Sequence, residues 1–207
     1  MLKKILFVLG IFTIAFVVLL ISIFDSSAIN YSVTKSPSQP SFENNTPNIN
    51  YTLPYMGRVL PDSPFWGLKA LRDKIWFGIT TSHLRRAELA LLFSDKRLLM
   101  SKKLFEEGKT DVAVSTFTKG EKYLAIAVSE EVLASKNGMD TGNFLNKLAL
   151  AALKHKEVGE DLIQLAPEEA KPLIVKTKVY ARDAYEAARN ALNSKGLPVP
   201  KDPFDGD

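Results

Sequence analysis

The chain has 207 residues, enough for one domain and an additional segment. Its 27 Lys and Arg residues against 23 Asp and Glu residues give a net charge of +4. Charges of both signs are interspersed, so the composition argues against a nucleic-acid partner. The sequence contains no cysteine, which excludes disulfides, thiol catalysis, thiolate metal sites and an acylated-cysteine anchor.

The first predicted element is an apolar segment, residues 5–24, which contains no charged residue. Twenty helical residues span about 30 Å, the thickness of the hydrocarbon core of a bilayer. Residues 1–24 are therefore predicted to be a transmembrane anchor. Lys3 and Lys4 precede the segment and place the N-terminus in the cytoplasm, with the C-terminal domain outside. The alternative is a signal peptide cleaved after Ala28, because Ser26-Ser27-Ala28 has the small residues of a cleavage site.

Residues 25–57 are rich in Ser, Asn, Thr and Pro, which predicts a flexible linker. A short helix is then predicted over residues 64–79, with Ser63 as N-cap and Pro64 at the first helical position. Its apolar residues recur at helical spacing. They are Phe65, Leu68, Leu71, Ile75 and Ile79.

The rest of the chain predicts longer helices, since its apolar residues keep a period near 3.6. The predicted helices cover about 82–107, 110–136, 141–165 and 167 onward, the last with a bend or restart at Pro172. Glycines are expected to end three of them, at positions 108, 138 and 196.

The predicted fold class is all-α. Short loops favour an antiparallel bundle of about four long helices plus the short one, within residues 58–196. A helical-repeat array is disfavoured, because the predicted helix starts are unevenly spaced. Residues 197–207 are predicted to be a disordered acidic tail.

The segment Leu53-Pro54-Tyr55-Met56-Gly57-Arg58-Val59-Leu60-Pro61-Asp62-Ser63-Pro64, followed by Leu68–Asp73, resembles the opening motif of the domain of unknown function 5667 family, a bacterial family. Further segments of this chain resemble family segments over residues 51–195. They are Arg86–Leu89, Asp95–Leu98 and Ala166–Lys171. Ser82-His83 departs from the Asp-Pro that the family often has before its second helix. The resemblance implies an exported, mostly helical domain of unknown role.

His155 is the most conspicuous candidate for chemistry, because it falls on an apolar helix face between Leu148 and Leu162. Its neighbours one turn away are apolar or glycine, so they supply no metal ligand and no group to orient the ring. A hydrogen-bonded core histidine is therefore favoured over a ligand or base. Ser82-His83 lacks the carboxylate that a catalytic triad requires, and Ser82 is explained as an N-cap.

The predicted helix 64–79 carries the candidate contact residues for a partner or a membrane. They are Trp66, Lys69, Arg72, Trp76 and Phe77. Packing against the bundle, insertion at a membrane surface and binding to a protein partner all fit this combination of aromatic and basic residues.

These observations predict a non-enzymatic, membrane-anchored extracytoplasmic domain that acts as a scaffold or partner-binding module of the cell envelope. No catalytic, cofactor-binding or metal-ligating residues are assigned, and no cofactor, metal or nucleic acid is expected. The expected partners are the membrane, through residues 5–24, and an envelope protein. The alternative is a secreted or periplasmic chaperone-like or ligand-binding protein, released by signal cleavage. A hydrolase is the least favoured class, since the chain has two histidines and no cysteine.

Overall fold

The structure is a computed structural model that describes residues 47–205. The predicted anchor, residues 1–24, and the linker as far as residue 46 lie outside the described residues. Within residues 47–205 every regular element is a helix, so the all-α prediction is confirmed there. None of the helices in this range is long and apolar enough to cross a membrane.

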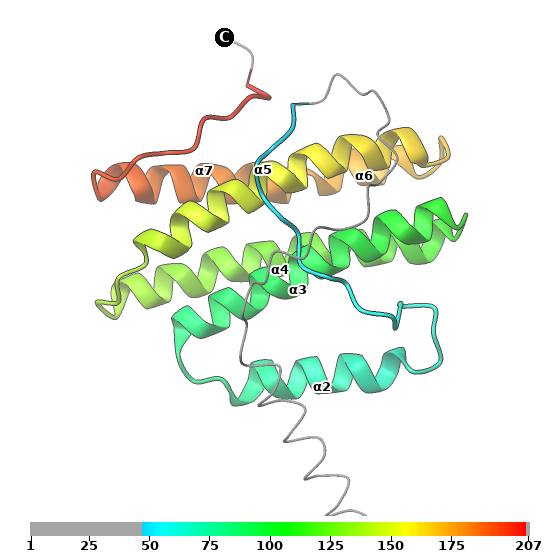
Figure 1. The fold of residues 1–207 in the computed structure, drawn as a ribbon, viewed down its shortest axis with the longest axis horizontal. Coiled ribbons are helices and arrows are strands. Elements are labelled where there is room, and N and C mark those ends of the chain that lie inside the picture. The colour runs from blue at the N-terminus through cyan, green and yellow to red at the C-terminus, as the bar shows by residue number, and fades with distance from the viewer. Residues whose placement is uncertain (1–46, 206–207) are drawn as a thin grey trace, which may run out of the picture.

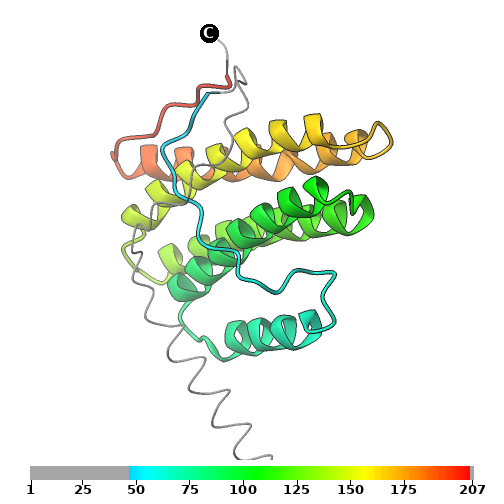
Figure 2. The same cartoon turned by 45° about the vertical axis from the view of Figure 1, so that its right-hand side comes forward.

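The helices form three layers (Figures 1 and 2). The middle layer is a hairpin of α3 (His83–Glu106) and α4 (Thr110–Lys136). On one side of it lie α5 (Gly142–Leu165), α6 (Lys171–Thr177) and α7 (Val179–Ser194), and on the other side lies α2 (Trp66–Ile79). The main core fills the space between the middle layer and the α5–α7 layer. Its fully buried leucines include Leu91, Leu124, Leu145, Leu148 and Leu153.

Helices α3 and α4 are in close contact at Gly120. A Cβ added to Gly120 would lie 3.1 Å from the Cβ of Arg97, which is tighter than ordinary packing. The Ser94 hydroxyl, on α3, donates a hydrogen bond of 2.8 Å to the Gly120 carbonyl oxygen. The absence of a side chain at this position therefore allows the two helices to pack backbone against side chain.

The predicted helix ends are largely confirmed. Ser82 accepts a hydrogen bond from the backbone N–H of Arg85 and so caps α3. Gly108, Gly138 and Gly196 follow the C-termini of α3, α4 and α7 with φ of +72°, +74° and +66°. Glycine adopts this left-handed conformation without the steric cost that a Cβ would impose.

Two helix starts differ from their predictions. Helix α2 begins at Trp66 and not at Pro64, and its N-cap is Phe65 and not the predicted Ser63. The Ser63 hydroxyl instead accepts from the N–H of Phe65 in the turn before the helix. The fifth predicted helix begins at Lys171, with Pro172 in its first turn, where a missing N–H is tolerated. That helix is divided at Lys178 into α6 and α7.

Residues 47–57, here called the strap, pack against the bundle, whereas the sequence predicts a flexible linker up to residue 57. Ile49 is 8% exposed and belongs to the main core. Its N–H donates a 2.8 Å hydrogen bond to Oε2 of Glu157 on α5. The packed part of the chain therefore begins before residue 58.

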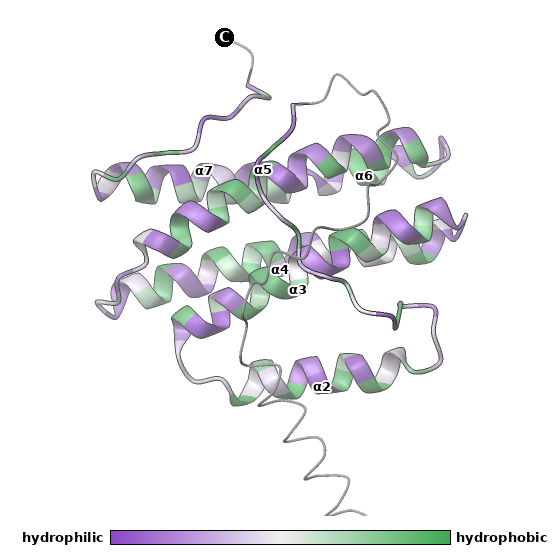
Figure 3. Ribbon diagram, viewed as in Figure 1, coloured by the Kyte–Doolittle hydropathy of each residue, from purple (hydrophilic) through white to green (hydrophobic). Residues whose placement is uncertain are grey.

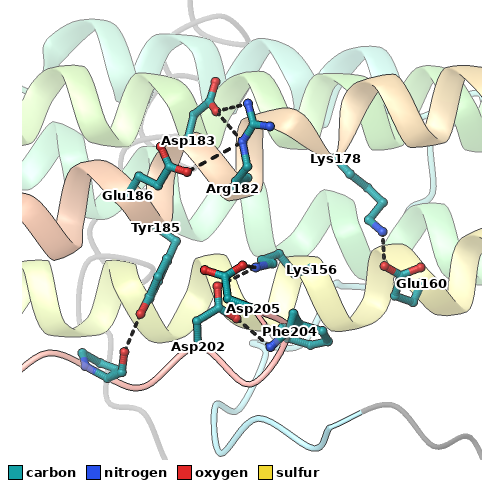
Figure 4. A network of polar contacts seen from close by, with 11 residues as sticks. Lys156, Glu160, Lys178, Arg182, Asp183, Tyr185, Glu186, Asp202, Phe204 and Asp205 are labelled. Carbon is teal, nitrogen blue, oxygen red and sulfur yellow. Dashed lines mark hydrogen bonds and ion pairs between the residues drawn. The ribbon is translucent and has the colours of Figure 1, made fainter. Parts of the chain in front are cut away.

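The C-terminal residues also differ from expectation. The sequence predicts a disordered tail, but residues 197–205 run beside α5 and α7 (Figures 1 and 4). Asp202 is 8% exposed, and its Oδ2 lies 2.5 Å from the Lys156 ammonium. The Tyr185 hydroxyl donates to the Pro200 carbonyl oxygen at 2.7 Å. These contacts explain how a segment rich in Pro and Asp becomes ordered.

Candidate functional site

His155 lies on α5 between two buried carboxylates. Its Nδ1 is 2.6 Å from Oε1 of Glu121 on α4, and its Nε2 is 3.1 Å from Oδ1 of Asp95 on α3. All three side chains are buried. One imidazole therefore connects three helices.

A fourth segment reaches the same point. The Tyr51 hydroxyl, on the strap, donates a 2.7 Å hydrogen bond to Oδ2 of Asp95. Tyr51, Asp95, Glu121 and His155 are called the His155 cluster below. The strap thus covers the cluster and ties the start of the described chain to its centre.

The two carboxylates determine the charge of the imidazole. Burial alone would lower the pKa of His155, but the Glu121 carboxylate and the hydrogen bond to Asp95 outweigh it and raise that pKa to about 9. The ring is therefore an imidazolium at neutral pH, and both of its nitrogens donate. The second Glu121 oxygen, Oε2, is buried without a hydrogen-bond partner among the described residues.

The contacts of His155 hold segments from different parts of the chain together. The His155 side chain is 0% exposed, and an imidazolium has no free lone pair for a metal. Within residues 47–205 no group of three or more His, Cys, Asp or Glu residues is arranged to hold a metal ion.

The structure agrees with a hydrogen-bonded core histidine, but the sequence reasoning missed the partners of His155. It considered residues one turn away on the same helix, whereas Asp95 and Glu121 come from α3 and α4. The sequence nevertheless contained an indication of these two partners. Asp95 follows Leu91 by four residues, and Glu121 follows Phe117 by four, so both carboxylates fall on apolar helix faces.

The other histidine lies at the edge of the bundle. His83 Nδ1 is 2.7 Å from Oε2 of Glu130, whose other oxygen is 2.9 Å from Nε of Arg86. Ser82 is the α3 cap, as predicted, and its oxygen is occupied by the N–H of Arg85. Ser82 and His83 therefore take separate structural contacts.

The candidate contact residues of α2 turn largely toward α3 and the loop before α2. Trp76 is 9% exposed and packs edge-on against Phe93, with ring centroids 6.0 Å apart. Phe77 lies beneath the guanidinium of Arg86, 4.5 Å from its ring centroid. The Trp66 ring is half-buried and lies 5.3 Å from the Lys69 ammonium.

The two basic candidates of α2 also have contacts within the chain. The Lys69 ammonium donates to the carbonyl oxygens of Met56 and Val59 at 3.1 and 2.9 Å. Its partial burial lowers the pKa of Lys69 to about 8. Arg72 pairs with the buried Asp73 at 2.7 Å.

The opposite side of α2 is apolar, and no other part of residues 47–205 covers it. It consists of the residues that the sequence places at helical spacing. They are Phe65, at 64% exposure, Leu68 at 70%, Leu71 at 53%, Ile75 at 37% and Ile79 at 57%. This set is called the outer face of α2 (Figure 3 shows the apolar and polar residues alternating along the helix). Phe65 immediately precedes the helix.

A second feature of the surface is an open depression of about 560 Å³ between α4 and α6. Val114 on α4, and Ala170 and Leu173 at α6, give it apolar walls. Lys119 and Lys122 line the same depression.

The described residues form a small all-α bundle. Its central imidazole and carboxylates are buried, and its peripheral helix α2 exposes an apolar face. Residues 58–169, 112 of the 207, match the model of a family described as domain of unknown function (DUF5667). The chain belongs to this family. No curated protein and no solved structure matches it. The matched range contains α2 to α5, and it does not include the strap, α6 or α7.

Proposed function

We propose that the protein is a membrane-anchored, extracytoplasmic, non-enzymatic interaction module of the bacterial cell envelope. The observation that carries the proposal is the outer face of α2, where five large apolar side chains are between 37% and 70% exposed. A contiguous exposed apolar face on a helix is typical of surfaces that bind another protein or a membrane. The reactive groups of the His155 cluster, by contrast, are inside the bundle.

The sequence supports the anchored location. Residues 5–24 have the length and composition of a membrane-spanning helix, and Lys3 and Lys4 favour a cytoplasmic N-terminus. In this proposal the bundle is held outside the membrane and acts by contact.

Cell fractionation combined with mass spectrometry of the mature N-terminus tests the location. The expected result is a chain in the membrane fraction that retains residues 1–28. A chain that begins near Ile29 in the soluble envelope fraction or the medium would contradict the anchor.

The depression between α4 and α6 favours a second candidate, a released ligand-binding or chaperone-like protein. Such a protein is expected to bind a hydrophobic dye while folded. Leu173→Asp, which changes a wall of the depression, would then reduce dye binding, and Val179→Asp is the control because Val179 is similarly exposed but does not line it. Equal dye binding by both variants would argue against the depression as the binding site.

A further inference from the structure

The outer face of α2 has the composition of a helix that lies in a lipid–water interface. Leu68, Leu71 and Ile75 lie along one side of the helix, with Phe65 at its start and Ile79 at its end. Interfacial helices present such a side to the acyl chains and carry basic residues at its borders. The helix packs against α3 with its opposite side, and among the described residues, 47–205, none covers the outer face.

The charges of α2 complement an anionic surface. At 3.6 residues per turn, Arg72 and Lys74 border the outer face, one on each side. Lys74 is exposed, and Arg72 is partly exposed. The one acidic side chain of α2 is Asp73, which is 5% exposed and pairs with Arg72 at 2.7 Å. No carboxylate of α2 therefore opposes approach to anionic headgroups.

The chain that precedes the structure can place this face at a bilayer. The described chain starts beside α5, where the Ile49 N–H donates a hydrogen bond to Glu157, and α5 is in the layer farthest from α2 (Figure 1). A chain arriving from a bilayer beneath α2 must therefore pass three helical layers. Layers of packed helices are about 10 Å apart, which makes that passage roughly 30 Å. The 22 residues between Phe24 and Pro47 reach at most about 75 Å when extended. They also have linker composition, for which a root-mean-square span of about 25 Å is expected.

From these observations we infer that the outer face of α2 lies on an anionic lipid bilayer, the same bilayer that holds residues 5–24. The inference rests on the proposed function, since it requires the anchored chain. The exposed face then contacts lipid. The bundle is oriented with α2 at the membrane and the α5–α7 layer away from it. Two membrane contacts, an anchor and an interfacial helix, would hold the domain in one orientation.

The absence of cysteine allows a clean test, because a single introduced cysteine gives one labelling position. The full chain is reconstituted into phosphatidylcholine vesicles with and without phosphatidylglycerol, with a nitroxide label on Leu68→Cys. Label collisions with oxygen, which partitions into lipid, are compared with collisions with a water-soluble nickel chelate. The control is Val175→Cys on α6, since Val175 is 55% exposed in the layer away from α2.

The expected result is a several-fold loss of nickel-chelate collisions at position 68 in vesicles that contain phosphatidylglycerol, with no loss at position 175. A water-exposed label at position 68, in a chain that remains bound to the vesicles, overturns the inference and leaves the anchor intact. A chain that does not stay with the vesicles contradicts the proposed function itself. A label at position 68 that is protected from the nickel chelate in detergent without lipid would show that protein, and not lipid, covers the outer face. Spin–spin broadening would identify that protein as a second copy of the chain, and either result would overturn the inference.

A second variant tests the same surface without relying on one label. Leu71→Glu combined with Ile75→Glu adds two carboxylates to the outer face, at positions that are exposed, so folding is expected to be retained. The label at position 68 should then return to water in anionic vesicles. A label that stays lipid-exposed in this folded variant contradicts a contact made by the outer face.

Discussion

His155 and Glu121 form a charged pair entirely inside the bundle, with Nδ1 of His155 2.6 Å from Oε1 of Glu121. The pair joins α5 to α4, and Asp95 extends it to α3. A buried ion pair adds little stability compared with an apolar contact, but removing one partner leaves an uncompensated charge. The cluster therefore favours one arrangement of the helices over alternatives in which a carboxylate would be buried alone.

Replacing the imidazole should be costly. His155→Ala leaves Asp95 and Glu121 buried without a cation, so we expect a loss of about 3–5 kcal/mol in the free energy of unfolding. Urea unfolding followed by circular dichroism measures it. The control is His83→Ala, whose ion pair with Glu130 is partly exposed at 32% on the histidine side, and a loss below about 1 kcal/mol is expected. Equal losses for the two variants would contradict a special role for the buried cluster.

The same cluster predicts a dependence of stability on pH. The pKa of His155 is raised to about 9 in the folded chain, from an unfolded value of 6.5. Its stabilisation is therefore complete below about pH 6.5 and is lost as the pH rises through 9, a total on the order of 3 kcal/mol. Melting temperatures between pH 6.5 and 10 should fall more in the native chain than in His155→Ala.

That comparison with His155→Ala is needed because Lys69 acts in the opposite direction. Its pKa is lowered to about 8 by burial, so Lys69 makes stability rise between pH 8 and about 10.5. Lys69 is present in both proteins and cancels in their difference. Parallel curves for the two proteins would show that the imidazole is not charged inside the fold.

The strap should contribute to the stability of the fold through the Tyr51 hydroxyl. Tyr51→Phe removes the 2.7 Å hydrogen bond to Asp95 and leaves Oδ2 of a buried carboxylate without that donor. We expect a loss of about 1–3 kcal/mol. Tyr55→Phe makes the same chemical change at a side chain that belongs to a residue 72% exposed, and should have almost no effect. Equal melting temperatures for the two variants would show that the hydrogen bond from the strap does not stabilise the cluster.

The orientation of α2 can be tested by truncating one side chain on each of its sides. Trp76→Ala removes the ring that packs against Phe93 and should cost about 3 kcal/mol or release α2 locally, which amide hydrogen exchange of α2 would detect. Leu71→Ala, on the outer face at 53% exposure, should change stability by less than about 0.5 kcal/mol. The reverse order of the two effects would mean that the outer face is the packed one.

The contact made by the C-terminal residues also yields a prediction. Asp202 pairs with Lys156 at 2.5 Å, and its other oxygen accepts from the N–H of Phe204 (Figure 4). Asp202→Ala should therefore cost about 1–2 kcal/mol and increase proteolysis of the tail. Asp205→Ala is the control, because its carboxylate is 67% exposed and 3.6 Å from the same ammonium. No difference between the variants would indicate that the tail does not dock through Asp202.

Local rules predicted the helices well and the site poorly. Ser82, Gly108, Gly138 and Gly196 act within one turn of themselves, so their roles as helix boundaries could be read directly. The partners of His155 could not, because contacts 34 and 60 residues distant in sequence depend on how three helices pack.

The outer face of α2 illustrates the same limit. Its apolar spacing predicted an amphipathic helix, but the side that packs carries Trp66, Trp76 and Phe77, and the regular apolar stripe is exposed. Large rings that reach Phe93 and Arg86 on α3 bury more area than the aliphatic stripe would.

The sequence by itself determined the all-α class, the helix boundaries set by capping residues and glycines, and membership of a family, because each depends on interactions within a few residues or on direct similarity. Only the tertiary structure decided that the strap and the tail are packed, that Tyr51, Asp95, Glu121 and His155 meet, and which side of α2 is left uncovered. These features depend on the burial of surfaces contributed by distant segments, and periodicity along one helix contains no information about which segment will cover it.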